Sequence, residues 1–141
     1  MNFLIIKVKG LSMSPYFVDN DELIVTNSDL SYEFGSCYHN NGIVHRAINS
    51  QILKGDRLIY TDMISDPSSS HKVIGRIISK DPLKISNKNN NILIFLNFII
   101  GILSKYNLEK NKFRYLSVVG IIIIAKVYRL LENFIIQKDS I

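Results

Sequence analysis

Cysteine is nearly missing from this chain of 141 residues, and tryptophan is missing altogether. The single cysteine, Cys37, excludes an internal disulfide and any metal site built from several cysteines. Histidine is also scarce, with three residues in the whole chain, so few side chains are suited to act as a base near neutral pH. We therefore expect neither a metal nor a cofactor.

A long apolar run is missing from the N-terminus. The opening "MNFLIIKVKG" has four consecutive apolar residues before Lys7, fewer than the roughly 7–15 of a secretory signal peptide. A DNA-binding helix pair is not expected ahead of residue 8. Basic residues elsewhere are not interleaved with stacking aromatic residues, which argues against nucleic acid as a partner.

Charge is distributed unevenly along the chain. Residues 1–71 hold 5 Lys/Arg against 8 Asp/Glu, whereas residues 72–141 hold 12 against 4. The basic half also contains the long apolar runs, a combination typical of segments that meet an anionic membrane surface. The alternative is a solvated basic face that keeps an apolar protein in solution.

The first eighty residues predict a mainly β domain. Short runs rich in Ile and Val, namely "FLIIKVK", "ELIVT", "GIVHRAI", "RLIYT" and "KVIGRIIS", are each bounded by Gly, Asn, Asp or Ser. None of them shows a sustained helical period. We expect a β-rich domain over residues 1–80 and a polar linker over residues 81–91.

The remaining residues, 92–141, predict an apolar, basic helical extension with segments at 92–104 and 116–136. Each segment places polar residues on one helical face: Asn97, Gly101 and Ser104 in the first, and Lys126, Arg129 and Asn133 in the second. A core strand is an alternative for "VVGIIIIAKV", because periodicity does not separate the two for short apolar runs.

The extension predicts membrane association rather than two clean membrane spans. A spanning helix needs about 20 apolar residues. Residues 92–104 are too few, and residues 116–136 reach that length only with Lys126, Arg129 and Glu132 included. A helical hairpin that lies on a membrane or packs on the β domain fits better, and burial between two copies is another alternative. We expect a membrane-associated protein, with a cytoplasmic one as the alternative; the side of the membrane and the oligomeric state stay open.

The candidate chemistry lies in "VKGLSMSPYFVDNDELIV", residues 8–25. A serine hydroxyl such as that of Ser12 is a poor nucleophile until a base takes its proton. His39 and His71 lie in or beside loops, whereas His45 lies in the strand-like "GIVHRAI". Strand alternation places His45 on the face opposite Arg46.

An acid that orients the histidine would complete the arrangement. The stretch "LKGDRLIYTDMISDP" offers Asp56, Asp62 and Asp66. Asp56 follows Gly55 and Asp66 precedes a proline, as turn residues do. Asp62 follows a strand-like run and is the one least readily explained as a turn residue.

These blocks together resemble the signal-peptidase-like serine peptidases, the superfamily that also contains the LexA-type self-cleaving repressors. "GLSMSP" with "DNDELIV", then "IVHRAI", "LKGDRLIYTD" and "VIGRII" occur in the family's order over residues 8–78. Signal peptidase I and the LexA-type proteins have lysine at the position of His45, whereas archaeal and eukaryotic signal peptidases have histidine. The chain therefore resembles the Ser-His branch and is expected to have that β catalytic fold.

The resemblance implies a serine endopeptidase that cleaves an extended precursor or leader peptide. Ser12 would be the nucleophile, His45 the base and Asp62 the orienting acid, with Asp56 a structural residue or the alternative acid. Met13 and Pro15 would line the substrate site. Three features depart from the family pattern: Asn20 replaces a glycine before Asp21, Gly35 is followed by Ser36 in place of an aspartate, and residues 34–45 are few.

Two other functions fit parts of the sequence. In the first, Cys37 is the nucleophile with His39 or His45, although two side chains on one strand point the same way without meeting. In the second, the chain is a catalytically degenerate, membrane-associated peptide-binding or adaptor protein. The shortened residues 34–45 and the basic apolar extension favour this second alternative.

Overall fold

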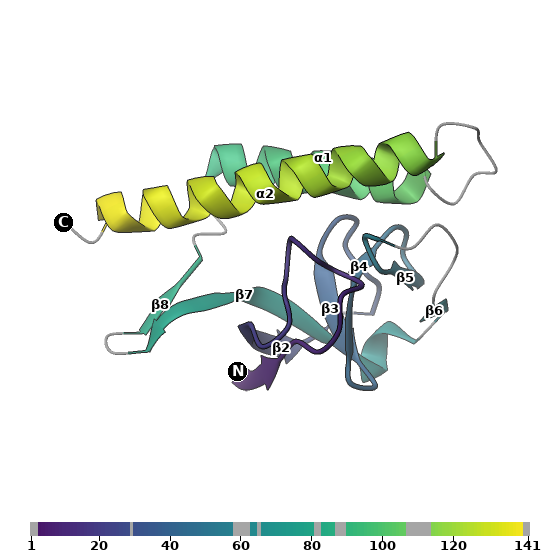
Figure 1. Cartoon of the computed structure of the whole chain (residues 1–141). Helices are drawn as coiled ribbons and strands as arrows, with labels where there is room; N and C mark the ends of the chain where they lie inside the picture. The colour runs from purple at the N-terminus through teal and green to yellow at the C-terminus, as the bar shows by residue number, and fades with distance from the viewer. Residues whose placement is uncertain are drawn as a thin grey trace.

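Within the part of the chain that the structure describes, the strands precede residue 86 and two helices follow residue 90 (Figure 1). The computed structural model describes residues 3–28, 30–57, 63–64, 66–80, 83–86, 90–106 and 114–139. The described elements are β1 (Phe3–Lys7), β2 (Glu22–Asn27), β3 (Cys37–Asn40), β4 (Ile43–Ala47), β5 (Ile52–Lys54), β6 (Met63–Ile64), a 3-10 turn (Pro67–Ser69), β7 (His71–Lys80), β8 (Leu83–Ile85), α1 (Asn91–Tyr106) and α2 (Arg114–Asp139). A mainly β first part with a helical second part is thereby confirmed.

The strands form an antiparallel sheet in the order β1-β2-β7-β3-β4-β5-β6, with β8 paired to β7. Strand β7 lies between β2 and β3, although it follows both by more than thirty residues. It pairs with β2 along one edge and with β3 along the other. The β1–β2 and β3–β4 hairpins are therefore held in one sheet by β7.

The β3–β4 hairpin turns at Asn41 and Gly42. Both have positive φ, 51° and 80°, as the two-residue turn that matches the twist of a hairpin requires. This turn sets the register that pairs Tyr38 with His45. The side chain of His45 thus points to the same face of the sheet as that of Tyr38.

Helices α1 and α2 lie side by side over one face of the sheet (Figure 1). Their inner residues join the core of the β domain, where Leu93 and Ile100 of α1 and Ile121 of α2 lie in one buried cluster with Leu23 and Val44. On α1 the predicted face of Asn97, Gly101 and Ser104 is turned toward the sheet, because Gly101 and Ser104 are buried. The hairpin packs on the β domain, as one of the alternatives required.

Several boundaries differ from the sequence prediction. Residues 83–85, expected in a linker, form β8, because the short run "LKI" pairs with the far end of β7. The segment expected to begin at residue 116 begins at Arg114, and "VVGIIIIAKV" is helical throughout rather than a strand. The polar residues at both ends extend α2 beyond the apolar run that marked it in the sequence.

The expected membrane association is contradicted. Among the residues that the structure describes, no helix is both long enough and apolar enough to cross a membrane. Helix α1 has 16 residues, or about 24 Å, against a hydrocarbon core of about 30 Å. Helix α2 is longer but carries Lys126, Arg129 and Glu132 in its middle. Several apolar residues behind the prediction, such as Leu93 and Ile121, belong to the core shared with the sheet.

Candidate functional site

The structure brings Ser12 and His45 into contact, as the sequence predicted. The Ser12 Oγ lies 2.8 Å from the His45 Nε2, although 33 residues separate the two in the chain. His45 lies on β4 with 3% of its surface exposed, whereas Ser12 is half-buried in the loop between β1 and β2. A neutral imidazole whose Nε2 accepts the hydroxyl proton is the arrangement that general-base activation of serine needs.

The loop that carries Ser12, residues 8–21, is closed by its own backbone hydrogen bonds. The Val8 N–H donates to the Asp21 carbonyl at 2.8 Å, and the Phe17 N–H donates to the Met13 carbonyl at 3.0 Å. The Leu11 side chain is 65% exposed, so the Ser12 side of the loop faces solvent. The serine is thus held in an ordered turn and remains open to a substrate.

Gly55 packs directly against the Ser12–His45 pair, and its role was missed in the sequence. A Cβ at position 55 would lie 2.9 Å from the Ser12 Cβ and 3.1 Å from the His45 Nε2, so only glycine fits without displacement. The neighbouring Arg57 N–H donates to the Ser12 carbonyl at 3.0 Å. The glycine of the "LKGD" block is the only sequence feature that points to this contact, and its pattern also fits an ordinary turn.

Asp56 is bound by Arg46. The Arg46 Nε and Nη2 donate to the two Asp56 carboxylate oxygens at 2.8 and 2.9 Å, and both residues are fully buried. Burial lowers the pKa of Arg46, but the charge of Asp56, together with its hydrogen bonds and the smaller effects of Cys37 and Tyr16, outweighs burial and holds that pKa above its usual value. With both oxygens occupied by the guanidinium, Asp56 fits the structural role better than that of alternative acid.

The predicted orienting acid, Asp62, lies outside the residues that the structure describes. The atom that such an acid would bind is the Nδ1 of His45, which is buried. The assignment of Asp62 therefore stays a prediction.

The two predicted substrate-binding residues lie at different depths. Met13 is 1% exposed and belongs to the core cluster, where its Sδ accepts the Asp56 N–H at 3.4 Å. It supports the loop from beneath, and direct contact with a substrate does not agree with this burial. Pro15 is half-buried and follows a cis peptide bond.

Cys37 does not meet His45. Because Cys37 pairs with Arg46 across the β3–β4 ladder, its side chain lies on the opposite face of the sheet from His45. Burial raises the pKa of the Cys37 thiol to about 12, which keeps it protonated at neutral pH. His39 lies two residues along the same strand, and its pKa is lowered by burial and by the neighbouring His71. The arrangement does not support a cysteine nucleophile.

A cavity of about 1200 Å³ lies between the sheet and the helical hairpin, away from the Ser12–His45 pair. Its walls include Ile24 of β2, Val73 of β7 and Phe98 of α1, and neither Ser12 nor His45 lines it. Among the described residues no group of three or more His, Cys, Asp or Glu could hold a metal ion.

The Ser12–His45 contact, the Gly55 approach and the Arg46–Asp56 pair are properties of the chain itself. No protein-family model, no curated protein and no solved structure matches this chain.

Proposed function

We propose that the chain is a serine endopeptidase that resembles the Ser-His branch of the signal peptidases. The observation that carries this proposal is the 2.8 Å contact between the Ser12 Oγ and the His45 Nε2. Serine and histidine 33 residues apart, on a solvent-facing loop and a buried strand, are brought to the distance at which a proton passes between them.

The antiparallel sheet also fits the proposal. The blocks that resemble the family, residues 8–78, include the loop of Ser12, the strand of His45 and the Gly55–Asp56 turn, and these three converge on one site. The fold proposed is the β catalytic domain of the signal-peptidase and LexA superfamily, here with a helical hairpin packed on it.

The proposed reaction is acyl transfer to Ser12. The Ser12 Oγ attacks the carbonyl carbon of the scissile peptide bond while its proton passes to the His45 Nε2. The carbonyl oxygen becomes an oxyanion, which backbone N–H groups around Ser12 stabilise by about 3–4 kcal/mol per donor. The C–N bond then breaks and the amine leaves with the proton from His45. Water, deprotonated by His45, releases the acyl group and regenerates Ser12.

The proposed substrate is an extended precursor or leader peptide. The open side of the Ser12 loop carries the exposed Leu11, beside which a peptide strand can lie. By resemblance to the family, small side chains are expected next to the cleaved bond.

Labelling with a fluorophosphonate probe tests the proposal, because the probe reacts only with an activated serine. We expect labelling of the wild type, and its loss by a factor on the order of 10⁴ or more in Ser12→Ala and in His45→Ala. Ser14→Ala, in the same loop, and His39→Ala, on the other face of the sheet, are the matched controls and should label normally.

Unfolding curves must show that all four variants are folded. Labelling retained in Ser12→Ala or in His45→Ala contradicts the proposal. A folded wild type that does not label favours instead a peptide-binding or adaptor protein with this fold.

A further inference from the structure

Helix α1 holds the strand of His45 from the far side of the sheet. The Asn97 Oδ1 accepts a hydrogen bond from the Arg46 Nη1, and both the Asn97 Nδ2 and the Arg46 Nη1 donate to the Gly35 carbonyl, at 3.0 and 2.8 Å. Arg46 is fully buried and follows His45 directly. A shift of Arg46 therefore moves the backbone from which the His45 ring projects.

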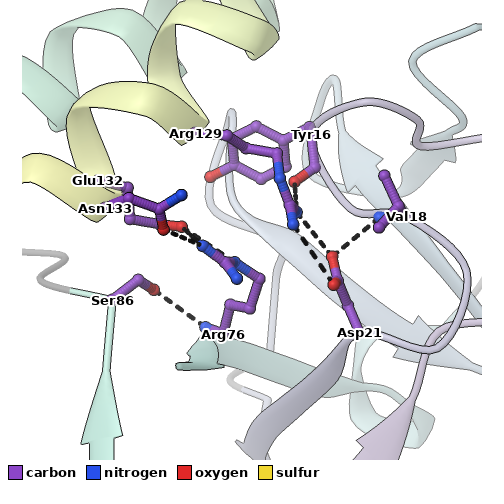
Figure 2. Close-up of polar contacts among 8 residues, drawn as sticks. All are labelled: Tyr16, Val18, Asp21, Arg76, Ser86, Arg129, Glu132 and Asn133. Atoms are coloured by element: carbon purple, nitrogen blue, oxygen red, sulfur yellow. Dashed lines mark hydrogen bonds and ion pairs between the residues drawn. The ribbon is translucent and has the colours of Figure 1, made fainter. Parts of the chain in front are cut away.

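Helix α2 holds the loop of Ser12. The Arg129 Nη1 donates to the Tyr16 carbonyl at 3.1 Å and to the Asp21 Oδ2 at 2.7 Å (Figure 2). The same Asp21 carboxylate accepts the Val18 N–H at 2.9 Å. One guanidinium thus binds the loop at two points, four and nine residues after Ser12.

The two sets of contacts meet at Tyr16. The Arg46 guanidinium lies over the Tyr16 ring, 4.5 Å from its centroid, at a distance typical of a cation–π contact. The Tyr128 ring of α2 also packs against the Tyr16 ring, with 4.7 Å between the two ring centroids. Burial, and next the proximity of Tyr128, raise the pKa of Tyr16, so the ring stays neutral between its partners. Tyr16 therefore joins α2, the Ser12 loop and the His45 strand.

We propose that the helical hairpin is a positioning element of the peptidase site: Asn97 holds His45 through Arg46, and Arg129 holds Ser12 through Tyr16 and Asp21. This inference rests on the proposed function and adds to it the residues that set the Ser12–His45 distance. None of them touches the reacting atoms. A displacement of about 1 Å between nucleophile and base costs on the order of 10²-fold in rate, so small losses of support are measurable.

The helical hairpin has a second anchor to the sheet, which serves as a control for the positioning role. Arg76 of β7 binds Glu132 of α2, with the Nε 2.9 Å from the Glu132 Oε1, and its Nη2 donates to Asn133 at 3.2 Å (Figure 2). This pair anchors α2 as Arg129 does, but to a strand that carries neither Ser12 nor His45. A hairpin that served only to stabilise the sheet would depend on both anchors alike.

The experiment measures the rate of fluorophosphonate labelling in the full-length chain at several probe concentrations, which separates the maximal rate from the apparent affinity. We expect Asn97→Ala and Arg129→Ala to lower the maximal rate by about 10–100-fold, with the affinity changed less than threefold. Glu132→Gln should keep the maximal rate within threefold of the wild type. Asn97→Asp, which retains an oxygen acceptor for Arg46, should restore most of the rate lost in Asn97→Ala. Rates are compared at equal folded fraction, determined by urea unfolding.

A second measurement does not depend on activity. The ¹⁵N shift of the His45 Nε2 reports its hydrogen bond with Ser12, so Ser12→Ala defines the value without that bond. We expect Asn97→Ala and Arg129→Ala to move the shift toward that value and Glu132→Gln to leave it in place. If Asn97→Ala does not fold, Asn97→Asp and Arg129→Lys are measured instead. We expect them to move the His45 ¹⁵N shift in the same direction by a smaller amount.

Two results overturn the inference. One is an equal loss of rate in Arg129→Ala and Glu132→Gln that follows the loss of stability; the other is an unchanged His45 shift in both hairpin variants. A wild type that does not label overturns the proposed function, and the His45 shift then still decides whether the hairpin sets the Ser12–His45 contact.

Discussion

His45 and Arg46 are neighbours in the sequence and lie on opposite faces of one sheet. His45 faces the half-buried Ser12, with which it shares one hydrogen bond. Arg46 faces the helical hairpin and is bound by Asp56, Asn97 and the Gly35 carbonyl, with no exposed surface. The comparison shows two different environments: the face with the Ser12–His45 contact is partly open, whereas Arg46, on the face that packs against the helical hairpin, is fully buried and hydrogen-bonded.

We expect the largest effect from removing the Arg46–Asp56 ion pair on the packed face. Asp56→Ala leaves the Arg46 guanidinium buried without its carboxylate, and we expect it to lower the free energy of unfolding by about 3–5 kcal/mol. Urea unfolding measures this loss. The double variant Arg46→Met/Asp56→Ala removes the stranded charge and should recover part of the stability. A double variant less stable than Asp56→Ala would show that the charge is not the cause.

The next largest effect is expected from a substitution beside the Ser12–His45 pair on the open face, which leaves the packed face unchanged. Gly55→Ala places a Cβ 2.9 Å from the Ser12 Cβ and 3.1 Å from the His45 Nε2. We expect the labelling rate to fall about 10²-fold, with about 1–3 kcal/mol lost in the free energy of unfolding. Gly120→Ala on α2, where an added Cβ would meet only the end of Leu103 at 3.4 Å, should leave labelling unchanged. Normal labelling in Gly55→Ala would show that the pair tolerates displacement.

A smaller effect sharpens the comparison through pH. Cys37 lies on the packed face, where burial raises the pKa of its thiol from 9.0 to about 12. The unfolded chain therefore loses the thiol proton first, and stability falls as the pH rises from about 9 toward 12, by at most about 1.4 kcal/mol per pH unit. Urea unfolding at pH 8, 9 and 10 should show this fall in the wild type and a weaker one in Cys37→Ala. Equal falls in both would place the titration elsewhere.

The smallest effect belongs to neither face. Glu33 and Lys72 form an ion pair with side chains 67% and 34% exposed. Solvent screens such a pair, so Glu33→Gln should change the free energy of unfolding by no more than about 0.5 kcal/mol and leave labelling unchanged. A larger loss on unfolding would show that this end of the sheet is more tightly coupled to the core than its exposure indicates.

Local patterns predicted some of the strands, and the long-range contacts poorly. Runs rich in Ile and Val predicted β1, β2, β4 and β7, whereas β3, "CYHN", has no such run and was not predicted. The predicted run "RLIYT" lies mostly outside the residues that the structure describes. The run that forms β4 alternates between the two faces of the sheet. The same alternation placed Arg46 opposite His45. It could not identify Asn97 as the partner of Arg46, because that contact spans 51 residues and an amide on a helical face has many alternative partners.

The resemblance led to Ser12 and His45 as candidates, whereas the residues around them were not predicted. The order of the sequence blocks led to Ser12 and His45, whose contact no local period reveals. Gly55 was overlooked because a close approach between distant backbones leaves no local signal beyond the glycine itself. The membrane prediction was wrong because a helix that meets lipid and a helix that fills a core have the same apolar composition. Leu93 of α1 and Ile121 of α2 fill the core.

The insertion of β7 between β2 and β3 has a consequence for the order in which the chain becomes reactive. Ser12 and His45 belong to different hairpins, and the strand that joins the two hairpins is complete only at Lys80. A nascent chain that ends before His71 already contains Ser12, His45 and Gly55, yet lacks β7, the strand that brings the hairpins into one sheet. We expect such a chain to be inert toward its own segments and toward neighbouring nascent chains. The sheet order thus delays the Ser12–His45 contact until most of the β domain has been synthesised.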